Sequence, residues 1–381
     1  MAFQWPSSVP LVCLATRQSD LRPQGFAKRM KIEALNELSA PCARLSASHA
    51  RAIARDLYGI EAGATRFATE KDDTFRLDAT DGRQYVLKIA HPSEPYEELD
   101  FQVAILRHLE SVAPGLPVPR SFPDRQGRAI ADIVTEDGER RLVRLMSFLP
   151  GTPLDAATSS REQRIRIGEL SARLRLAMAD FHHLRESRFV AWDVQNLASL
   201  AGLLHHIADE THRGFVSRAL GLFEDIRPRL DLCRRQVLHN DMNTSNLVVD
   251  AADPSIVSGV IDFGDAVKTA IAIDVSTTLM NQMPKTLVAE DGVDPFEAPR
   301  DVVSGYLRHA DLTDEELTLI PFLALGRQAT RALLTSWRAS LFPDNAAYIL
   351  RNTQAGWGHL AWFHSLSPQQ IGDLLHMFRS S

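Results

Sequence analysis

Residues 237–250 read VLHNDMNTSNLVVD and set a polar segment between two apolar runs. The polar segment contains His239, Asp241 and Asn246. Asn and Asp often close turns, because their side chains bond their own backbone. The flanking runs, however, have the composition of buried strands, and a polar loop held between strands is rigid enough to position reactive groups. The stretch therefore predicts either a simple turn or a loop that carries chemistry, and partners elsewhere in the chain decide between the two.

Two further polar residues stand in apolar surroundings. Asp262 follows an apolar run in VSGVIDFGDA, residues 257–266, and is expected to project from the end of a buried strand, although a turn-forming Asp would fit the same place. Lys88 lies in YVLKIA, residues 85–90, which is otherwise apolar. A lysine with such neighbours either lies on the solvent face of an edge strand or is held by an anion. Taken alone, Lys88 favours the solvent face.

Together these residues meet the needs of phosphoryl transfer from a nucleotide. That reaction requires a cation on the phosphates, Mg²⁺ between phosphate oxygens and a carboxylate near the attacking hydroxyl. Lys88 can supply the cation and Asp241 the carboxylate. Asn246 and Asp262 can supply the oxygen ligands that Mg²⁺ prefers. The order Lys…Asp-x-x-x-x-Asn…Asp-Phe-Gly is also that of the protein-kinase signature set.

The chain departs from protein kinases at three places. Its loop reads His-Asn-Asp in place of His-Arg-Asp, and no Ala-Pro-Glu follows Asp262. A Gly-x-Gly-x-x-Gly loop is absent, and ATEKDDTFRL, residues 68–77, takes its position, where backbone amides could still reach phosphates. These differences disfavour a protein kinase.

Composition limits the class of protein. The chain has 381 residues, 45% hydrophobic and 24% charged, which favours a soluble globular protein of two lobes or domains. The net charge of −6 and the lack of a Lys/Arg block disfavour a nucleic-acid partner. The three cysteines are far apart, so neither a zinc site nor a disulfide framework is expected. With no apolar run near the roughly 18 residues of a membrane span, we expect a cytoplasmic protein without a membrane partner.

The chain divides into three segments. Residues 1–45 are interrupted by prolines and predict an irregular extension. Residues 46–146 combine a helix, a TDG hairpin and an amphipathic helix with a strand, and predict a small β-rich N-terminal lobe. Residues 147–381 are mostly helical, interrupted by the two polar segments, and predict a larger C-terminal lobe. The fold class is therefore α+β.

Four motifs carry a resemblance to a known family. They are VLHNDMNTSNLVVD, VSGVIDFGDA, EELDFQVAILRHL and FLPGTPL. They resemble the aminoglycoside phosphotransferase and choline kinase superfamily, and TEKDDTFRL, AWDVQNL and SWRASLFPDNAAYIL resemble its hydroxylysine kinase branch. The similarity runs from about Ser46 to about Trp362. It implies a two-lobed, protein-kinase-like fold and a Mg²⁺-dependent transfer of phosphate from ATP or GTP to a small-molecule hydroxyl.

The resemblance also implies roles for individual residues. Asp241 becomes the catalytic base, Asn246 and Asp262 become the Mg²⁺ ligands, and Lys88 binds the nucleotide phosphates. The acidic partner of Lys88 aligns best with Asp100, and Glu97 and Glu98 are alternatives. The nucleotide base is expected beside the linker after Arg144, where the neighbouring residues are Met146, Ser147 and Phe148. His239 is expected to brace the loop.

The acceptor has to be inferred from charge. An amino alcohol needs carboxylates near the cleft, and an amino acid also needs a cation for its own carboxylate. The candidate residues are two acids, one aromatic wall and one cation, namely Asp265, Asp193, Trp192 and Arg327. Asp193 fits a helix-capping acid equally well, Trp192 could instead fill the core, and Arg331 and Arg338 could replace Arg327.

Three functions remain open. The first is a kinase of hydroxylysine or a related hydroxylated amine or amino acid. The second is a kinase of the same fold with another substrate, such as homoserine, choline, an aminoglycoside or a sugar. The third is a non-catalytic nucleotide-binding module, which the intact set of Lys, Asp, Asn and Asp disfavours. The sequence does not distinguish ATP from GTP.

Overall fold

The computed structural model describes residues 43–69, 72–154, 159–285, 287 and 294–380. Most of the predicted extension, residues 1–45, lies outside the described residues. Pro41–Ser381 forms one compact unit. The division of this unit into lobes at residues 146 and 147 stays a prediction.

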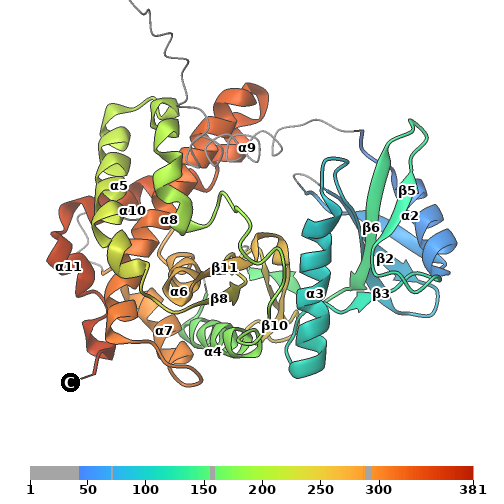
Figure 1. The fold of residues 1–381 in the computed structure, drawn as a ribbon, viewed down its shortest axis with the longest axis horizontal. Coiled ribbons are helices and arrows are strands. Elements are labelled where there is room, and N and C mark those ends of the chain that lie inside the picture. The colour runs from blue at the N-terminus through green and yellow to red at the C-terminus, as the bar shows by residue number, and fades with distance from the viewer. Residues whose placement is uncertain (1–42, 70–71, 155–158, 286, 288–293, 381) are drawn as a thin grey trace, which may run out of the picture. The chain divides into compact units, whose positions relative to one another are not determined.

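The N-terminal part is built on an antiparallel sheet of six strands (Figure 1). Its main path runs β1-β2-β3-β6-β4, and β5 also pairs with β6. The strands are β1 Ala62–Arg66, β2 Asp73–Ala79, β3 Gln84–Ile89, β4 Ser121–Phe122, β5 Ala131–Val134 and β6 Arg140–Ser147. The predicted hairpin joins β2 to β3, and Gly82 in its turn has φ +84°, a conformation that favours glycine.

Lys88 lies on a central strand of this sheet. β3 pairs with β2 on one side and with β6 on the other, where Lys88 faces Arg144 in the register. The Lys88 side chain is only 17% exposed. The interpretation of Lys88 as a solvent-facing residue of an edge strand is therefore wrong, and an anion must hold its charge.

Two helical segments accompany the sheet. The first is α2, Ala47–Ile53, which continues as a π-helical turn, Ala54–Tyr58. Ser46 caps α2 by accepting the His49 N–H, as the predicted helix start requires. The second is α3, Tyr96–Val112, which buries an apolar face and confirms the predicted amphipathic helix.

Helices dominate the rest of the chain (Figure 1). They are α4 Arg161–Ala177, α5 Glu210–Leu230, α6 Ile271–Met280, α7 Glu297–Tyr306, α8 Asp314–Leu341, α9 Ala346–Leu350, α10 Thr353–Ser365 and α11 Pro368–Gly372. Short 3₁₀ segments lie at Val194–His206, Phe263–Asp265, Pro343–Asn345 and His376–Phe378. None of the helices among the described residues is both long and apolar enough to span a bilayer.

The pair α4 and α7 packs through two glycines. A Cβ on Gly168 of α4 would lie 2.0 Å from the Val302 carbonyl oxygen, and one on Gly305 of α7 would lie 2.0 Å from the Ile165 carbonyl oxygen. The two backbones therefore approach as closely as only glycine permits.

Small β-structures hold the two polar segments. β8, Arg235–Leu238, pairs with β11, Val267–Ala270. β9, Leu247–Val249, pairs with β10, Val257–Val260, and with β7, Thr152–Pro153. Residues 239–246 therefore form the predicted loop between two strands, and residues 261–266 connect β10 to β11.

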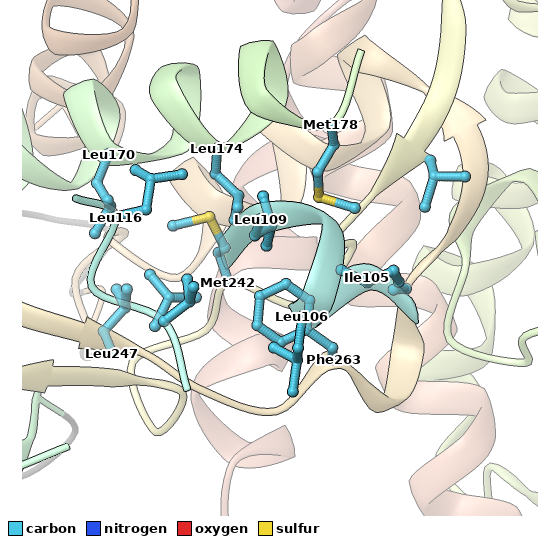
Figure 2. Packing of buried hydrophobic residues seen from close by; sticks show 14 of the residues in the cluster. Ile105, Leu106, Leu109, Leu116, Leu170, Leu174, Met178, Met242, Leu247 and Phe263 are labelled. Carbon is cyan, nitrogen blue, oxygen red and sulfur yellow. The ribbon is translucent and has the colours of Figure 1, made fainter. Parts of the chain in front are cut away.

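Both polar segments are anchored in a hydrophobic core. Met242 and Leu247 are fully buried, and Phe263 is nearly so. Figure 2 shows them among leucines of α3 and α4, such as Leu109 and Leu174. Buried apolar residues in and beside the two segments thus fix the backbone, which leaves the polar side chains in defined positions.

Candidate active site

The backbone of the 239–246 loop is held from two sides. Asn240 takes φ +61°, and its N–H donates to Oδ1 of Asp274 at 2.7 Å. Asp274 is buried near the start of α6. Nε2 of His239 lies 3.1 Å from the Ile261 carbonyl oxygen, and its Nδ1 accepts the Asp241 N–H at 3.3 Å. Burial lowers the pKa of His239, so a neutral ring braces the loop, as expected.

The Asp241 carboxylate receives three side-chain donors. Arg327 Nη2 donates to Oδ1 at 2.8 Å. The side-chain amides of Asn243 and Asn246 donate to Oδ2 at 2.9 and 2.8 Å. A carboxylate offers about four lone-pair positions, so roughly one position, on Oδ1, remains for a further donor. Burial raises the pKa of Asp241, and the Arg327 cation opposes that rise.

Asp262 projects from the end of β10 with φ +67°. Its Oδ1 accepts the Gly264 N–H at 3.2 Å and lies 3.5 Å from Nζ of Lys88. Lys88 lowers the pKa of Asp262, so this carboxyl is ionised near neutral pH. The anion that holds Lys88 is therefore Asp262, whose side chain is 48% exposed and open to a ligand.

The residues predicted to bind Mg²⁺ suit that ion. Asp262 offers an ionised carboxylate, and the Asn246 amide, which donates its N–H to Asp241, keeps its oxygen as a ligand. Mg²⁺ takes few protein oxygens and keeps water and phosphate oxygens as its other ligands. The described residues gather no cluster of three or more His, Cys, Asp or Glu that could hold a metal ion.

Asp265 stands beside the catalytic loop without an ion pair among the described residues. Burial and the charge of Asp241 raise the pKa of Asp265 to about 7. A cation bound near Asp265 would lower that pKa, because it would favour the ionised form. Asp265 therefore keeps its predicted place as a candidate for the amine of an acceptor.

The predicted ion pair between Lys88 and Asp100 is not formed in this structure. Asp100 Oδ2 lies 3.2 Å from Nε2 of His183, and its side chain is 48% exposed. The buried acid of α3 is Glu98, which binds Arg185 and, at 2.6 Å, Nη1 of Arg188. Neighbouring residues of a helix point to different faces. Asp100 was predicted because it matches the acidic position of the family motif, but its side chain contacts His183 in place of Lys88.

Asp193 does not fit the role of a substrate ligand. Its side chain is fully buried, and it caps the 3₁₀ segment Val194–His206. Its carboxylate accepts from the Gln195 side-chain amide at 2.5 Å and from Thr269 Oγ1 at 3.1 Å. Burial raises the pKa of Asp193 to about 6. The capping alternative is therefore the one that the structure supports.

Trp192 and Arg327 lie together beside Asp241. Nη1 of Arg327 donates to the Trp192 carbonyl oxygen, and the guanidinium carbon lies 5.3 Å from the centre of the Trp192 ring. Cation–π contact and the ion pair with Asp241 fix the Arg327 side chain, which is 5% exposed. Of the predicted acceptor residues, Arg327 contacts the predicted base directly, and Trp192 contacts Arg327.

The segment predicted to face the nucleotide base lies at the end of β6. Met146 is buried, and Phe148 stacks on Phe67 with ring centres 6.5 Å apart. The N–H of Ser147 donates to the Arg120 carbonyl, and that of Phe148 donates to Gln84. These two amides are already satisfied, so they are not available to a base.

Three neighbours of the site had no place in the predictions. Asp274 anchors Asn240, Asn243 orients Asp241, and Arg144 lowers the pKa of Asp262 in addition to Lys88. Arg144 is nearly buried and donates to Gln102 Oε1 at 2.6 Å. Arg144 lies opposite Lys88 in the register of β3 and β6. Pairing the two predicted strands at the sequence level would have placed Arg144 beside Lys88.

Known proteins are similar to this chain in sequence. Hydroxylysine kinase of Mus musculus is 23% identical over 351 residues, which cover 86% of this chain and 91% of that protein. Homoserine kinase of Zymomonas mobilis is 28% identical over 305 residues, which cover 78% of this chain and 87% of that protein. Both relatives are kinases of hydroxy amino acids by name.

Solved structures confirm the predicted α+β, protein-kinase-like fold. A microcompartment-associated aminopropanol kinase superposes with a TM-score of 0.64 at 18% identity, covering 84% of this chain and 98% of that one. An amicoumacin kinase in complex with AMP-PNP, Ca²⁺ and Ami superposes with a TM-score of 0.62 at 17% identity, covering 87% and 96%. The sequence pattern of the phosphotransferase enzyme family matches residues 64–312, which confirms the resemblance on which the site prediction rests. The chain therefore belongs to the phosphotransferase enzyme family and is a small-molecule kinase.

Proposed function

We propose that this kinase transfers the γ-phosphate of ATP or GTP to the hydroxyl of a small amine or amino acid, with a hydroxylysine-like acceptor favoured. The observation that carries the proposal is the meeting of three distant segments. Lys88 lies 3.5 Å from Asp262, and Asn246 lies 2.8 Å from Asp241, each measured between side-chain atoms. The N–H of Ile261, next to Asp262, donates to the Asn246 carbonyl at 2.9 Å and links the two pairs. The residues proposed as phosphate cation, metal ligands and base thus lie on segments that contact one another.

In the proposed reaction Asp241 orients the acceptor hydroxyl through the lone pair of Oδ1 that the protein leaves open. A bond forms between the acceptor oxygen and the γ-phosphorus as the bond to the β–γ bridging oxygen breaks. The hydroxyl proton passes to Asp241 late, because the transition state is loose. The nucleoside diphosphate leaves, and the phosphate ester of the acceptor is the second product.

The remaining side chains stabilise charge. Lys88, released from Asp262, binds the phosphates of the nucleotide. Asn246 and Asp262 would hold Mg²⁺, which neutralises phosphate charge when it is bound. Preorganised charges of this kind contribute most of the rate in phosphoryl transfer, where the protein performs little covalent chemistry.

Another acceptor on the same fold is the main alternative. Homoserine, choline and aminoglycosides also offer a hydroxyl and an amine, and the two relatives named above include a homoserine kinase. A non-catalytic nucleotide-binding module is disfavoured, because the set of Lys88, Asp241, Asn246 and Asp262 is intact, whereas an inactive kinase usually lacks at least one of its catalytic residues.

The test is a nucleotide-consumption assay with purified protein and Mg²⁺. ATP and GTP are each offered with 5-hydroxylysine, homoserine, threonine, ethanolamine, choline and kanamycin, and Asp241→Asn is the control variant. We expect turnover with one class of acceptor and a loss of roughly 10²–10⁴-fold in Asp241→Asn, which is the usual contribution of a general base. Absence of turnover, together with absence of Mg²⁺-dependent nucleotide binding by calorimetry, would contradict the proposal.

A further inference from the structure

Arg331 lies next to the predicted base and takes part in none of the steps above. It follows Arg327 by four residues on α8, and residues so spaced share one face of a helix. Arg327 reaches Asp241 from this face, and the charge of Asp241 also acts on Arg331. The Arg331 side chain is partly exposed, so a ligand in the site can reach it.

Arg331 has a neutral partner where a carboxylate would be expected. Its Nη2 donates to Oδ1 of Asn281 at 3.2 Å, and no Asp or Glu of the described residues lies within ion-pair distance of it. The amide nitrogen of Asn281 donates to the Thr277 carbonyl at 2.7 Å. That bond fixes the amide so that its oxygen faces Arg331, and the position of the guanidinium is set before any ligand arrives.

Among the described residues, the two guanidinium groups have one carboxylate within ion-pair distance. Asp241 pairs with Arg327, and the hydrogen-bond partner of Arg331 is the neutral Asn281. Burial and the neighbouring Arg327 lower the pKa of Arg331 to about 10. Nε of Arg327 is buried and has no hydrogen-bond partner among the described residues. A guanidinium with a neutral partner, next to a second guanidinium, is complementary to an anion.

We propose that Arg331, with Arg327 and Asn281, forms a subsite for a carboxylate of the acceptor, so that the acceptor is a hydroxylated amino acid. The inference rests on the proposed kinase function and narrows its substrate class. One turn of helix, about 5.4 Å, separates the two arginines. The hydroxyl oxygen and the carboxylate carbon of homoserine or 5-hydroxylysine are four or five bonds apart, about 5–6 Å for bonds of ~1.5 Å. An acceptor hydroxyl on Asp241 thus places a carboxylate near Arg331.

The subsite also separates the candidate acceptors. Choline, ethanolamine and aminoglycosides lack a carboxylate and would leave Arg331 without an anion. Sites built to bind a polar group discriminate strongly against analogues that lack it, because their own polar groups remain unpaired. The amine of the amino acid has a separate candidate partner in Asp265.

The experiment compares acceptors that differ only in the carboxylate. The pairs are 5-hydroxylysine with 1,5-diaminopentan-2-ol and homoserine with 3-aminopropan-1-ol. Steady-state kinetics are measured for the wild type, Arg331→Met and Arg331→Lys. Arg351→Met serves as a control, because Arg351 is exposed and lies after α9. Circular dichroism and thermal unfolding check that each variant is folded.

We expect Arg331→Met to raise KM for the amino acid by roughly 10- to 100-fold, the value of a hydrogen bond to a charged group. The kcat should change far less, the decarboxylated partner should be unaffected, and Arg331→Lys should recover part of the loss. An equal change for both members of a pair, or no change for either, would overturn the subsite.

A binding measurement separates this inference from the proposed function. Calorimetric titration of both acceptor pairs, without nucleotide, needs no turnover. Binding of an amino acid and not of its decarboxylated partner, lost in Arg331→Met, supports the subsite even if no phosphate is transferred. Equal binding of both members of a pair, or binding of neither amino acid, overturns it even if an acceptor without a carboxylate is phosphorylated.

Discussion

Lys88 and Asp262 neutralise one another across 3.5 Å. Asp262 is half-exposed, so solvent screens the pair and its contribution to folding is on the order of 1 kcal/mol, although the largely buried Lys88 depends on it for its counter-charge. The same two charges are the ones that the proposed reaction assigns to phosphate and metal. Their effect is therefore expected mainly in ligand binding and to a smaller extent in stability.

Asp262→Asn tests this separation. We expect Mg²⁺ no longer to strengthen nucleotide binding and kcat to fall by about 10²-fold or more, while Tm falls by only about 2–4 °C, because Lys88 loses its counter-charge but keeps some contact with solvent. Calorimetry with ATP and with GTP, each with Mg²⁺ and with EDTA, measures the metal effect. Asp253→Asn, at an exposed turn, is the matched control. A variant that keeps the full Mg²⁺ effect would remove Asp262 from the metal site.

Asp265 predicts a pH dependence of stability. Its pKa of about 7 in the folded protein exceeds the ordinary value of about 3.9 for Asp. Between these values the folded state binds more protons, so this group lowers the free energy of unfolding as pH rises from about 4 to 7. Asp265→Asn removes the effect. The variant should therefore exceed the wild type in Tm at pH 8, on the order of 2 °C, and this advantage should shrink at pH 5. A difference that is the same at both pH values would contradict the assignment.

Motif residues were predictable one by one, and their partners were not. The spacing of Asp241, Asn246 and Asp262 predicts a common phosphoryl-transfer site. In the structure Asn246 contacts Asp241, and Asp262 contacts Lys88. The role of Asp193 could not be predicted from the sequence, because a buried Asp that caps a helix and an exposed Asp that binds a substrate can have the same neighbouring residues. Only the tertiary contact with Thr269 distinguishes them.

At the scale of elements, the close approach of α4 and α7 depends on Gly168 and Gly305. An alanine at Gly168 would place its Cβ against the backbone carbonyl of Val302, which cannot move without shifting α7. Gly214 lies exposed on α5 with open space around it. The three glycines look alike in the sequence, so the strength of the contact was not predictable from it.

Two alanine substitutions should therefore have opposite effects. Gly168→Ala should lower the free energy of unfolding by about 1–3 kcal/mol, the usual cost of overpacking. Gly214→Ala should raise it by roughly 0.5–1 kcal/mol, because alanine is the better helix former and meets no neighbour. Urea denaturation measures both. A stable Gly168→Ala protein would mean that the helices separate easily.

The predicted elements were right where a period or a turn defined them. The hairpin around Gly82 and the amphipathic helix α3 follow from local pattern alone. The pairing of β3 with β6 is not local, since the partner strand lies more than fifty residues later along the chain. The residues around Lys88 in the sequence therefore could not show that its strand is central in the sheet.

At the scale of the whole molecule, Glu98 and Arg188 join distant regions of the chain. Glu98 of α3 binds Nη1 of Arg188 at 2.6 Å, and Arg188 donates to the carbonyls of Gly264 and Ala266. Both side chains of the ion pair are about nine-tenths buried. Helix α3 is thereby tied to the segment that follows Asp262.

Loss of this link should destabilise the whole protein. Glu98→Gln leaves the buried Arg188 without its counter-charge, and we expect a loss of about 2 kcal/mol or more in the free energy of unfolding. Glu97→Gln, an exposed neighbour on the same helix, should change it by less than about 0.5 kcal/mol. Urea denaturation at neutral pH compares the two. Equal stability of both variants would show that the link carries no net energy.

The hydrogen-bond donors around Asp241 also affect the reaction with water when nucleotide is bound and no acceptor is present. Arg327, Asn243 and Asn246 together leave the carboxylate about one open position. A water molecule there has only that single hydrogen bond to hold it in line with the phosphorus, whereas an acceptor is also held by its other groups. A water molecule positioned so loosely lacks most of the rate acceleration that a well-oriented nucleophile gains from being bound. Hydrolysis of the bound nucleotide in the absence of an acceptor should therefore be slow, so that ATP or GTP is consumed mainly when an acceptor is bound.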